Sequence, residues 1–261
     1  MPGFAPALLI ALLAGVSFSE RLPELTGSLE DRVESLAREL DGDRPTLAFG
    51  LERRASDLDG ARAEVDVTPE LAEESLALLV PLADRLGMGR QRSRLEDASF
   101  RLLDPERYER AQAAVFTPPG EDDALLERIS AQTVGALARR SVQARASARV
   151  KSLYSLQRKA ARYGVEPEAL LDRLGVRVIV PSEADCYAAL QVIRAAHPEV
   201  PGSFDDYILL PKPSGYQSLH TAVLARTASG LVLPVELQIR TEAMHAAAES
   251  GAAAHWRYKL T

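Results

Sequence analysis

Two carboxylates occupy positions where an apolar strand rarely carries a charge. Asp172 comes just before the run GVRVIV, and Glu236 lies in VELQIR, where every second residue is Val, Leu or Ile. A buried carboxylate needs a cation or a metal ion as its partner. Two carboxylates from separate strands suit Mg²⁺, which completes its shell with water and substrate phosphates. Salt bridges to Arg177 and Arg240 would satisfy the same two side chains, and the spacing leaves both interpretations open.

Four cations gather within eleven residues of the chain: Arg149, Lys151, Arg158 and Lys159. The stretch RASARVK (145–151) alternates basic or hydroxyl residues with Ala and Val, which predicts a strand with one cationic face. Arg binds phosphate through a bidentate fork and Lys binds it as a point charge. A solvated basic face is the alternative, but the alternation points Arg149 and Lys151 the same way and favours a phosphorylated ligand. The chain contains no GxxxxGK(S/T) motif, which excludes a P-loop.

A third cluster, KPSGYQSLHT (212–221), places Lys212 and His220 on either side of a turn. Gly215 permits a sharp turn or a close backbone approach. Such a turn would present the Tyr216 ring to a groove in which a nucleobase could stack. A core tyrosine beside an ordinary turn is the alternative interpretation.

His245, Glu249 and His255 lie in the last segment, with His245 and Glu249 one helical turn apart. They resemble half of a metal site, but no second ligand pair has a zinc spacing. We interpret them as helix packing and surface polar pairs.

The elements that must position these side chains divide the chain in two. Residues 1–115 carry leucines at helical spacing, as in 71–86, and predict an all-helical region. The segment TPPGEDD (117–123) predicts a linker because it combines two prolines, a glycine and an acidic run. Helical and β-branched runs then alternate, with strands expected near 145–151, 175–180, 219–225 and 235–240. The sequence thus predicts a helical region over 1–116 and a mixed α/β region of four or five strands over 124–261.

The composition, 46% hydrophobic and 26% charged, is that of an ordinary globular protein. The single Cys186 excludes an internal disulfide and fits a reducing cytoplasm. Residues 1–139 hold 16 basic and 26 acidic side chains (net −10), whereas 140–261 hold 15 and 11 (net +4), a balance that suits a polyanionic ligand in the second half. The apolar run 7–16 follows no basic residue and is too short to cross a bilayer. We expect a cytoplasmic protein with no membrane partner.

Taken together, these segments resemble the synthetase domain of the RelA/SpoT alarmone synthetases. The matching stretches are ARVKSLYSLQRK (148–159), DRLGVRVIV (172–180), PGSFDDYILLPKPSGYQSLHT (201–221), VELQIRT (235–241) and MHAAAESGAAAHWRYK (244–259). The resemblance implies an α+β chain with a nucleotidyltransferase-like mixed sheet flanked by helices. It also implies transfer of pyrophosphate from ATP to the 3′-hydroxyl of GTP or GDP, the reaction of a GTP diphosphokinase.

The resemblance implies roles for individual residues as well. Asp172 and Glu236 would hold Mg²⁺, and Glu236 would help to deprotonate the attacking hydroxyl. The ligands of ATP would be Arg149, Lys151, Arg158 and Lys159. On the acceptor side, Tyr216 would stack on guanine, and the nucleotide would also contact Lys212, His220 and Gln238. This set agrees with the interpretation from the residues, because phosphoryl-type transfer depends on positioning and charge neutralisation.

The segment SFDD (203–206) occupies the position at which the family divides into a basic RxKD type and an acidic ExDD type. It sides with the acidic type, which implies synthesis only and a leaning toward GTP. Ser203 departs from the acidic first residue of that motif. Ser214 is a second departure, since the family carries Asn in KxNGYQS.

Residues 76–108 resemble the end of the family's hydrolase domain, but ALLAGV (11–16) stands where a hydrolase has ALLHDV, and no histidine precedes His197. We therefore expect 1–116 to be a degenerate HD hydrolase-like region without hydrolase activity. Two alternatives to (p)ppGpp synthesis are a toxin-like tRNA 3′-end pyrophosphokinase and a catalytically dead regulatory or interaction protein. The acidic first half argues against an RNA partner, and the presence of Asp172 and Glu236 argues against a dead protein. A homo-oligomer is compatible with the sequence.

Overall fold

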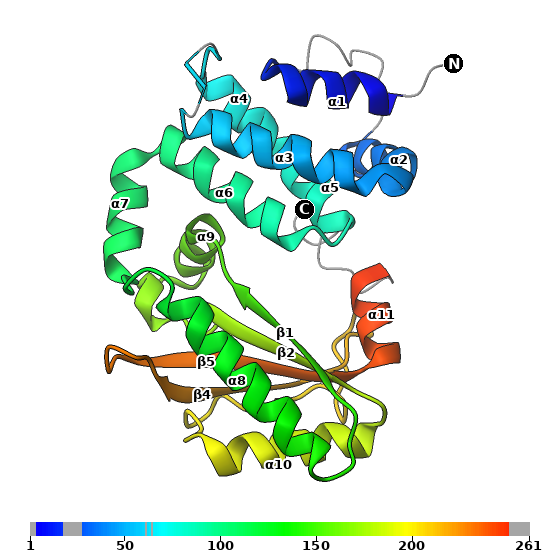
Figure 1. Ribbon diagram of the computed structural model, residues 1–261, viewed down its shortest axis with the longest axis vertical. Helices are drawn as coiled ribbons and strands as arrows, with labels where there is room; N and C mark the ends of the chain where they lie inside the picture. The colour runs from blue at the N-terminus through cyan, green and yellow to red at the C-terminus, as the bar shows by residue number, and fades with distance from the viewer. Residues whose placement is uncertain (1–3, 18–27, 61, 64, 251–261) are drawn as a thin grey trace. The chain divides into compact units, whose positions relative to one another are not determined.

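Apolar residues recur at helical spacing in the first half of the chain and alternate with polar residues in the second half. The first half folds into helices and the second half forms a mixed sheet. The computed structural model describes residues 4–17, 28–60, 62–63 and 65–250. The chain divides into two compact units (Figure 1). Of the described residues, unit 1 comprises those up to Ala113 together with Ser152–Ser155, and unit 2 comprises Ala114–Lys151 and those from Leu156 to Ser250.

Unit 1 is built from helices. They are α1 (Phe4–Ala14), α2 (Leu29–Leu40), α3 (Arg44–Leu58), α4 (Pro69–Glu74), α5 (Val80–Arg85), α6 (Gly89–Leu103) and α7 (Pro105–Ala114), with a 3₁₀ turn at Asp41–Asp43. In α2 the spacing of Val33, Leu36 and Leu40 puts all three on the buried side. A capping box between Ser28 and Asp31 satisfies N–H groups at the start of the same helix.

The leucine run 71–86 is not one continuous helix. Between α4 and α5, the segment Ser75–Leu79 forms a π-helical turn, in which the Val80 N–H donates to Ser75 O. Pro81 follows at the start of α5 and has no N–H with which to continue the ordinary helical ladder. The wider i→i−5 turn is a known way to accommodate such an interruption. The expected helical spacing is confirmed, with a bulge that the leucine pattern does not indicate.

Unit 2 is organised around a mixed sheet. Within the described residues this sheet has five strands in the order β1-β2-β5-β4-β3. The strands are β1 (Arg145–Val150), β2 (Leu174–Val180), β3 (Asp205–Asp206), β4 (Leu219–Arg226) and β5 (Val232–Thr241). β2 and β5 run parallel, and the other neighbours are antiparallel. The predicted α+β fold with a mixed sheet is confirmed.

One face of the sheet is apolar and covered. α8 (Glu121–Ala138) and α10 (Glu183–Ala196) pack on it, while α9 (Leu153–Tyr163) follows β1 and α11 (Glu242–Ser250) follows β5 (Figure 1). A 3₁₀ turn, Pro167–Ala169, precedes β2. Strand residues of one parity, such as Leu174, Val235 and Leu237, are fully buried against α8 and α10. Residues of the other parity form a second face, which we call the polar face.

One element boundary differs from the expectation. Residues 121–123 of the predicted linker form the first turn of α8, because three acidic side chains favour the positive end of a helix dipole. The last segment forms α11, which is described as far as Ser250, and His255 lies outside the described residues. None of the described helices combines the length and apolar character needed to cross a bilayer.

Candidate active site

The polar face of the sheet gathers many of the residues selected from the sequence. Strand pairing places Arg149, Gly175 and Glu236 in one row across β1, β2 and β5. In the next row, Gln238 on β5 is paired with His220 on β4. Directly paired residues share a face, so these side chains lie on the side of the sheet opposite α8 and α10.

Asp172 lies just before β2 and binds two lysines. Its Oδ2 atom accepts hydrogen bonds from Lys151 Nζ at 2.5 Å and from Lys159 Nζ at 2.7 Å. Burial alone would raise the pKa of Asp172, but the two ammonium groups outweigh burial and hold this pKa below its usual value. Burial lowers the pKa of Lys151, and the Asp172 carboxylate opposes that change. β1 and α9 thus bring their lysines to one carboxylate, while Arg149 and Arg158 on the same two elements are exposed.

The two candidate metal ligands are close enough to interact electrostatically. Asp172 Oδ1 is buried and has no hydrogen-bond partner among the described residues. An unpartnered carboxylate oxygen beside a second carboxylate fits Mg²⁺, which needs only one or two carboxylates in addition to water and phosphate oxygens. In the described part of the chain, no three His, Cys, Asp or Glu side chains form a more complete metal cluster. Asp172 and Glu236 are therefore the candidate metal ligands that the described residues offer.

Glu236 is held in place from two sides. Gln238 Nε2 donates to Glu236 Oε2 at 2.8 Å, and His220 Nδ1 lies 3.5 Å from Glu236 Oε1. His220 Nε2 lies 2.9 Å from the hydroxyl of Tyr216. Burial would raise the pKa of Glu236, but the interactions with His220 and Gln238 outweigh burial and lower this pKa. Glu236 is therefore ionised at neutral pH and fixed in orientation.

The turn predicted at 212–221 forms around Gly215. This glycine has a φ of 79°, which a residue without a side chain adopts readily, and its N–H donates to Lys212 O at 2.8 Å. Tyr216 is half-buried, with its hydroxyl directed to His220. It is neither a core tyrosine nor a free platform, because the hydroxyl is anchored while part of the side chain stays accessible.

Tyr207 belongs to the same cluster, although the sequence analysis did not select it. The Lys212 ammonium lies 4.2 Å from the centre of the Tyr207 ring. Backbone pairing in the loop brings this residue into the cluster. Tyr207 N–H donates to Ser218 O at 3.0 Å, so the residues that flank the loop are paired like the two arms of a hairpin.

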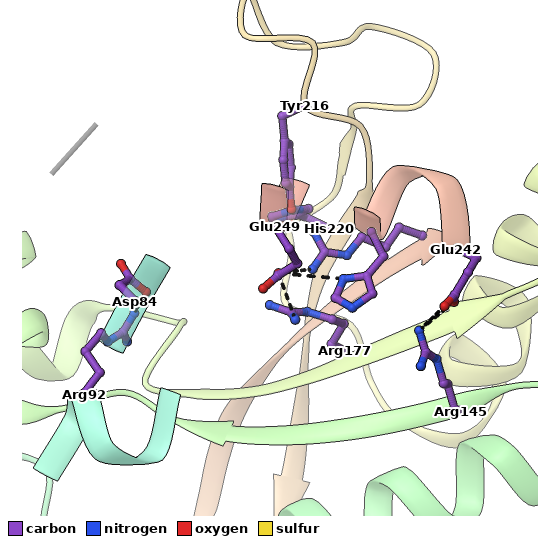
Figure 2. A network of polar contacts seen from close by, with 10 residues as sticks. Asp84, Arg92, Arg145, Arg177, Tyr216, His220, Glu242 and Glu249 are labelled. Carbon is purple, nitrogen blue, oxygen red and sulfur yellow. Dashed lines mark hydrogen bonds and ion pairs between the residues drawn. The ribbon is translucent and has the colours of Figure 1, made fainter. Parts of the chain in front are cut away.

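The salt bridges considered for Asp172 and Glu236 do not form with Arg177 and Arg240. Both guanidinium groups contact Glu249 Oε1 on α11 instead, Arg177 Nη1 at 3.1 Å and Arg240 Nη2 at 3.2 Å (Figure 2). Arg240 lies four residues beyond Glu236 on one strand, a separation of about 13 Å. His245 Nδ1 lies 3.7 Å from the same Glu249 oxygen, which agrees with the interpretation as polar pairs.

Comparison with known proteins adds an independent finding. Residues 148–261 match a family model described as a region found in RelA / SpoT proteins. A probable guanosine-3′,5′-bis(diphosphate) 3′-pyrophosphohydrolase of Synechocystis sp. is 40% identical over 190 residues, which cover 72% of this chain and 24% of that protein. The GTP pyrophosphokinase of Myxococcus xanthus is 37% identical over 189 residues, which again cover 72% of this chain and 24% of that protein. The chain spans about a quarter of the length of these curated relatives.

Among solved structures, the small alarmone synthetase 1 from Bacillus subtilis is similar to this chain. The TM-score is 0.48 at 25% sequence identity, and the match covers 60% of this chain and 82% of that one. The stretch matched by the family model begins on β1 and contains every candidate ligand described above, from Arg149 to Gln238. Residues 148–261 therefore belong to the RelA/SpoT family.

Proposed function

We propose that this chain is a (p)ppGpp synthetase, which transfers pyrophosphate from ATP to the 3′-hydroxyl of GTP or GDP. The observation that carries the proposal is the meeting of Asp172, Glu236 and the two lysines at the polar face of the sheet. Relatives named GTP pyrophosphokinase, 37% identical to this chain, support the same activity. Carboxylates and cations in one place match a transfer reaction that depends on charge neutralisation and positioning.

Asp172 and Glu236 would hold Mg²⁺, which offsets negative charge on the transferred phosphates. Asp172 already presents one unpartnered oxygen, and its other oxygen holds Lys151 and Lys159. A change of partner at Asp172 would release both ammonium groups toward the phosphates of ATP. Before ATP binds, Asp172 would thus keep both lysines next to the proposed position of the ATP phosphates.

The donor nucleotide would lie along β1 and α9. Arg149 and Arg158 are exposed on these elements and would reach ATP directly, together with Lys151 and Lys159. The substrates ATP, GTP and GDP place the proposed reaction in the cytoplasm.

The acceptor would lie on the side of Tyr216, which would stack on guanine, while Lys212, His220 and Gln238 contact the nucleotide. The 3′-oxygen forms a bond to the β-phosphorus of ATP as the bond from that phosphorus to the α,β-bridging oxygen breaks, and AMP leaves. The proton of the 3′-hydroxyl passes to Glu236. The interactions with His220 and Gln238 outweigh burial and lower the pKa of Glu236, so this carboxylate is ionised, the only state in which it can accept a proton.

Hydrolysis of the product is not part of the proposed function. Ala14 ends α1 and Gly15 has a φ of 74°, where the family's hydrolases carry a His-Asp pair. A Cβ at position 15 would lie 2.6 Å from Arg62 Nη2 and 2.8 Å from the Val65 side chain, so this site is built around glycine. Incubation of the protein with (p)ppGpp and Mn²⁺ is expected to release no pyrophosphate, and steady release would contradict this part of the proposal.

Incubation of purified protein with ATP labelled in its β-phosphate and Mg²⁺ tests the main proposal. Parallel reactions contain GTP, GDP or tRNA as the acceptor. We expect label to appear on GTP or GDP. Label on tRNA alone would assign the chain to the tRNA-modifying type, and no transfer to any acceptor would favour a regulatory protein.

A further inference from the structure

The Lys212 ammonium is held by aromatic rings instead of a carboxylate. It lies 4.2 Å from the centre of the Tyr207 ring and 5.5 Å from the centre of the Tyr216 ring. Within the described residues, Lys212 forms no ion pair. Lys151 and Lys159 differ in this respect, because both are bound to Asp172.

An aromatic ring and a carboxylate affect the charge of a neighbouring ammonium group differently. The face of an aromatic ring attracts an ammonium group through its quadrupole but carries no net charge. The full positive charge of Lys212 therefore stays available to an anion, whereas a carboxylate would neutralise it. A phosphate group that approaches Lys212 has no internal anion to displace.

The backbone fixes Tyr207 under the lysine. Tyr207 N–H donates to Ser218 O at 3.0 Å, and Lys212 N–H donates to Tyr216 O at 3.1 Å, so the loop is closed at two levels. Asp206 Oδ1 accepts the N–H groups of Ile208 and Leu209 at 3.1 and 2.9 Å. The residues on either side of Tyr207 are therefore anchored.

Neighbouring rings fix the Tyr207 side chain as well. The His220 ring stands edge-on to it at 5.3 Å and 84°, and the Tyr216 ring at 6.4 Å and 63°. Burial raises the pKa of the Tyr207 hydroxyl, and its interaction with the Asp205 carboxylate raises this pKa further. Tyr207 thus links the acidic segment 203–206 to the lysine.

We propose that Tyr207 is a positioning residue for the acceptor nucleotide, acting through Lys212, whose ammonium its ring holds in place for a phosphate of GTP or GDP. This inference rests on the proposed function, because it takes Lys212 to be an acceptor ligand. A lysine side chain is long and flexible, so a ring that limits its rotamers makes binding of the acceptor more favourable. The donor nucleotide gains nothing from this support.

Steady-state kinetics of Tyr207→Leu and Tyr207→Phe test the proposal. Leu removes the ring, and we expect the KM for the acceptor to rise about 2- to 30-fold, the range that cation–π energies span. The KM for ATP should stay within twofold of the wild-type value. Phe keeps the ring and should restore most of the acceptor affinity. An equal rise in both KM values, or an unchanged acceptor KM in Tyr207→Leu, would overturn the proposal.

A double-mutant cycle with Lys212→Met separates this role from a general effect on the loop. If Tyr207 acts through the lysine, adding Tyr207→Leu to Lys212→Met should cause little further loss of acceptor binding. Additive losses would contradict the inference. Tyr163→Leu is the matched control, because Tyr163 lies 6.0 Å from Lys159 and should leave the acceptor KM unchanged.

Two safeguards keep the outcome interpretable. Circular dichroism shows whether Tyr207→Leu is folded, and Tyr207→Met, which has a similar reach but no aromatic face, replaces it if it is not. A wild-type protein that transfers nothing would overturn the proposed function itself. Active wild-type protein with an unchanged acceptor KM in both the Leu and Met variants would overturn the role of Tyr207 alone.

Discussion

The two oxygens of Asp172 lie in different surroundings, and this difference bears on the reaction. Oδ2 holds both Lys151 and Lys159, whereas Oδ1 is buried without a partner. A buried carboxylate oxygen without a partner costs free energy, which binding of a cation at that oxygen would recover. The same carboxylate therefore orders Lys151 and Lys159, the proposed donor ligands, and leaves one oxygen for the proposed metal ion.

Replacement of Glu236 by Gln is expected to lower the transfer rate about 10²- to 10⁴-fold, the usual contribution of a general base. The amide can neither accept the proton of the 3′-hydroxyl nor supply a charged metal ligand, yet it has nearly the same shape. Radiolabel transfer from ATP measures the loss, with circular dichroism to compare the folds. Glu242→Gln, which changes an exposed carboxylate on α11, serves as the control. Wild-type turnover in Glu236→Gln would remove this residue from the mechanism.

Residue types in a strand pattern were sufficient to predict much of this site. Asp172 and Glu236 were visible because a carboxylate stood beside or within an apolar run, and the cations because they alternated or clustered. Tyr207 and Glu249 were not visible in this way. Tyr207 meets Lys212 through the closure of a loop, and Glu249 meets Arg177 through the way α11 lies on the sheet. A one-dimensional period contains neither contact.

Among the strands, the row Arg149–Gly175–Glu236 leaves room for a ligand at its centre. Gly175 has no side chain, and a Cβ at this position would lie 3.8 Å from its nearest neighbours, two backbone oxygens. The position is thus sterically open to a larger residue. The gap between an arginine and a carboxylate is available to a nucleotide or a metal ion.

Gly175→Val is expected to keep the fold and to lower transfer about 10²-fold by occupying this gap. A β-branched residue suits a strand, so the free energy of unfolding should not decrease. Gly175→Ala, which adds one methyl group, should give an intermediate rate. Urea denaturation and the transfer assay measure the two effects. Unchanged turnover in Gly175→Val would show that no reactant passes over this row.

One carboxylate of α11 contacts two arginines of the sheet. Glu249 contacts Arg177 (Figure 2). It also contacts Arg240, which is almost fully buried. Without Glu249, the Arg240 guanidinium would be left without its acidic partner. Glu242, on the same helix, pairs with Arg145 at an exposed position and offers a comparison.

Glu249→Ala is expected to lower the free energy of unfolding by about 1–3 kcal/mol, the cost of leaving a buried charged donor without its partner. Glu242→Ala should cost less than about 1 kcal/mol, because exposed ion pairs contribute little. Urea denaturation of both variants measures the difference. Equal costs would show that the contact with the buried arginine does not hold α11.

At the scale of the whole molecule, the free energy of unfolding depends on pH through an aspartate whose pKa is raised and two histidines whose pKa values are lowered. Burial raises the pKa of Asp97 to about 7, with Glu96 and Asp59 adding to the rise and hydrogen bonds from the Tyr154 and Leu153 backbones opposing it. Burial lowers the pKa values of His197 and His245, and nearby arginines lower them further. Asp97 therefore stabilises the fold at low pH, and this contribution is lost as pH rises through 7. The two histidines stabilise it above their ordinary pKa, and their contribution is lost as pH falls.

Asp97→Asn should remove one of these opposing contributions. Between pH values of about 3.8, the ordinary pKa of Asp97, and about 7, the folded wild type holds a proton at Asp97 that the unfolded chain releases. As pH falls across this range, the free energy of unfolding of the wild type should therefore rise relative to that of the variant. The Asn carbonyl can still accept the Tyr154 N–H, which lies 3.1 Å from Asp97 Oδ1. Urea denaturation at pH 5 and pH 8 measures the change. A constant difference between the two proteins would contradict it.

The sequence predicted the classes of structure better than their internal irregularities. Leucine spacing and β-branched alternation identified a helical first half and a mixed sheet, because both follow from local periodicity. The π-helical turn at Ser75–Leu79 and the parallel pairing of β2 with β5 did not follow from it. The π-helical turn before Pro81 and the order of the strands both depend on hydrogen bonds that form only in the folded chain.

That strand order has a consequence for the chain as it is being made. β5 is the last of the described strands to be translated, yet it occupies the middle of the sheet, between β2 and β4. A nascent polypeptide still attached to the ribosome holds its first acidic ligand early and its second only after residue 236 has emerged. A chain that stops before β5 lacks the strand between β2 and β4, so the two candidate metal ligands come together only in a sheet that already contains its fifth strand.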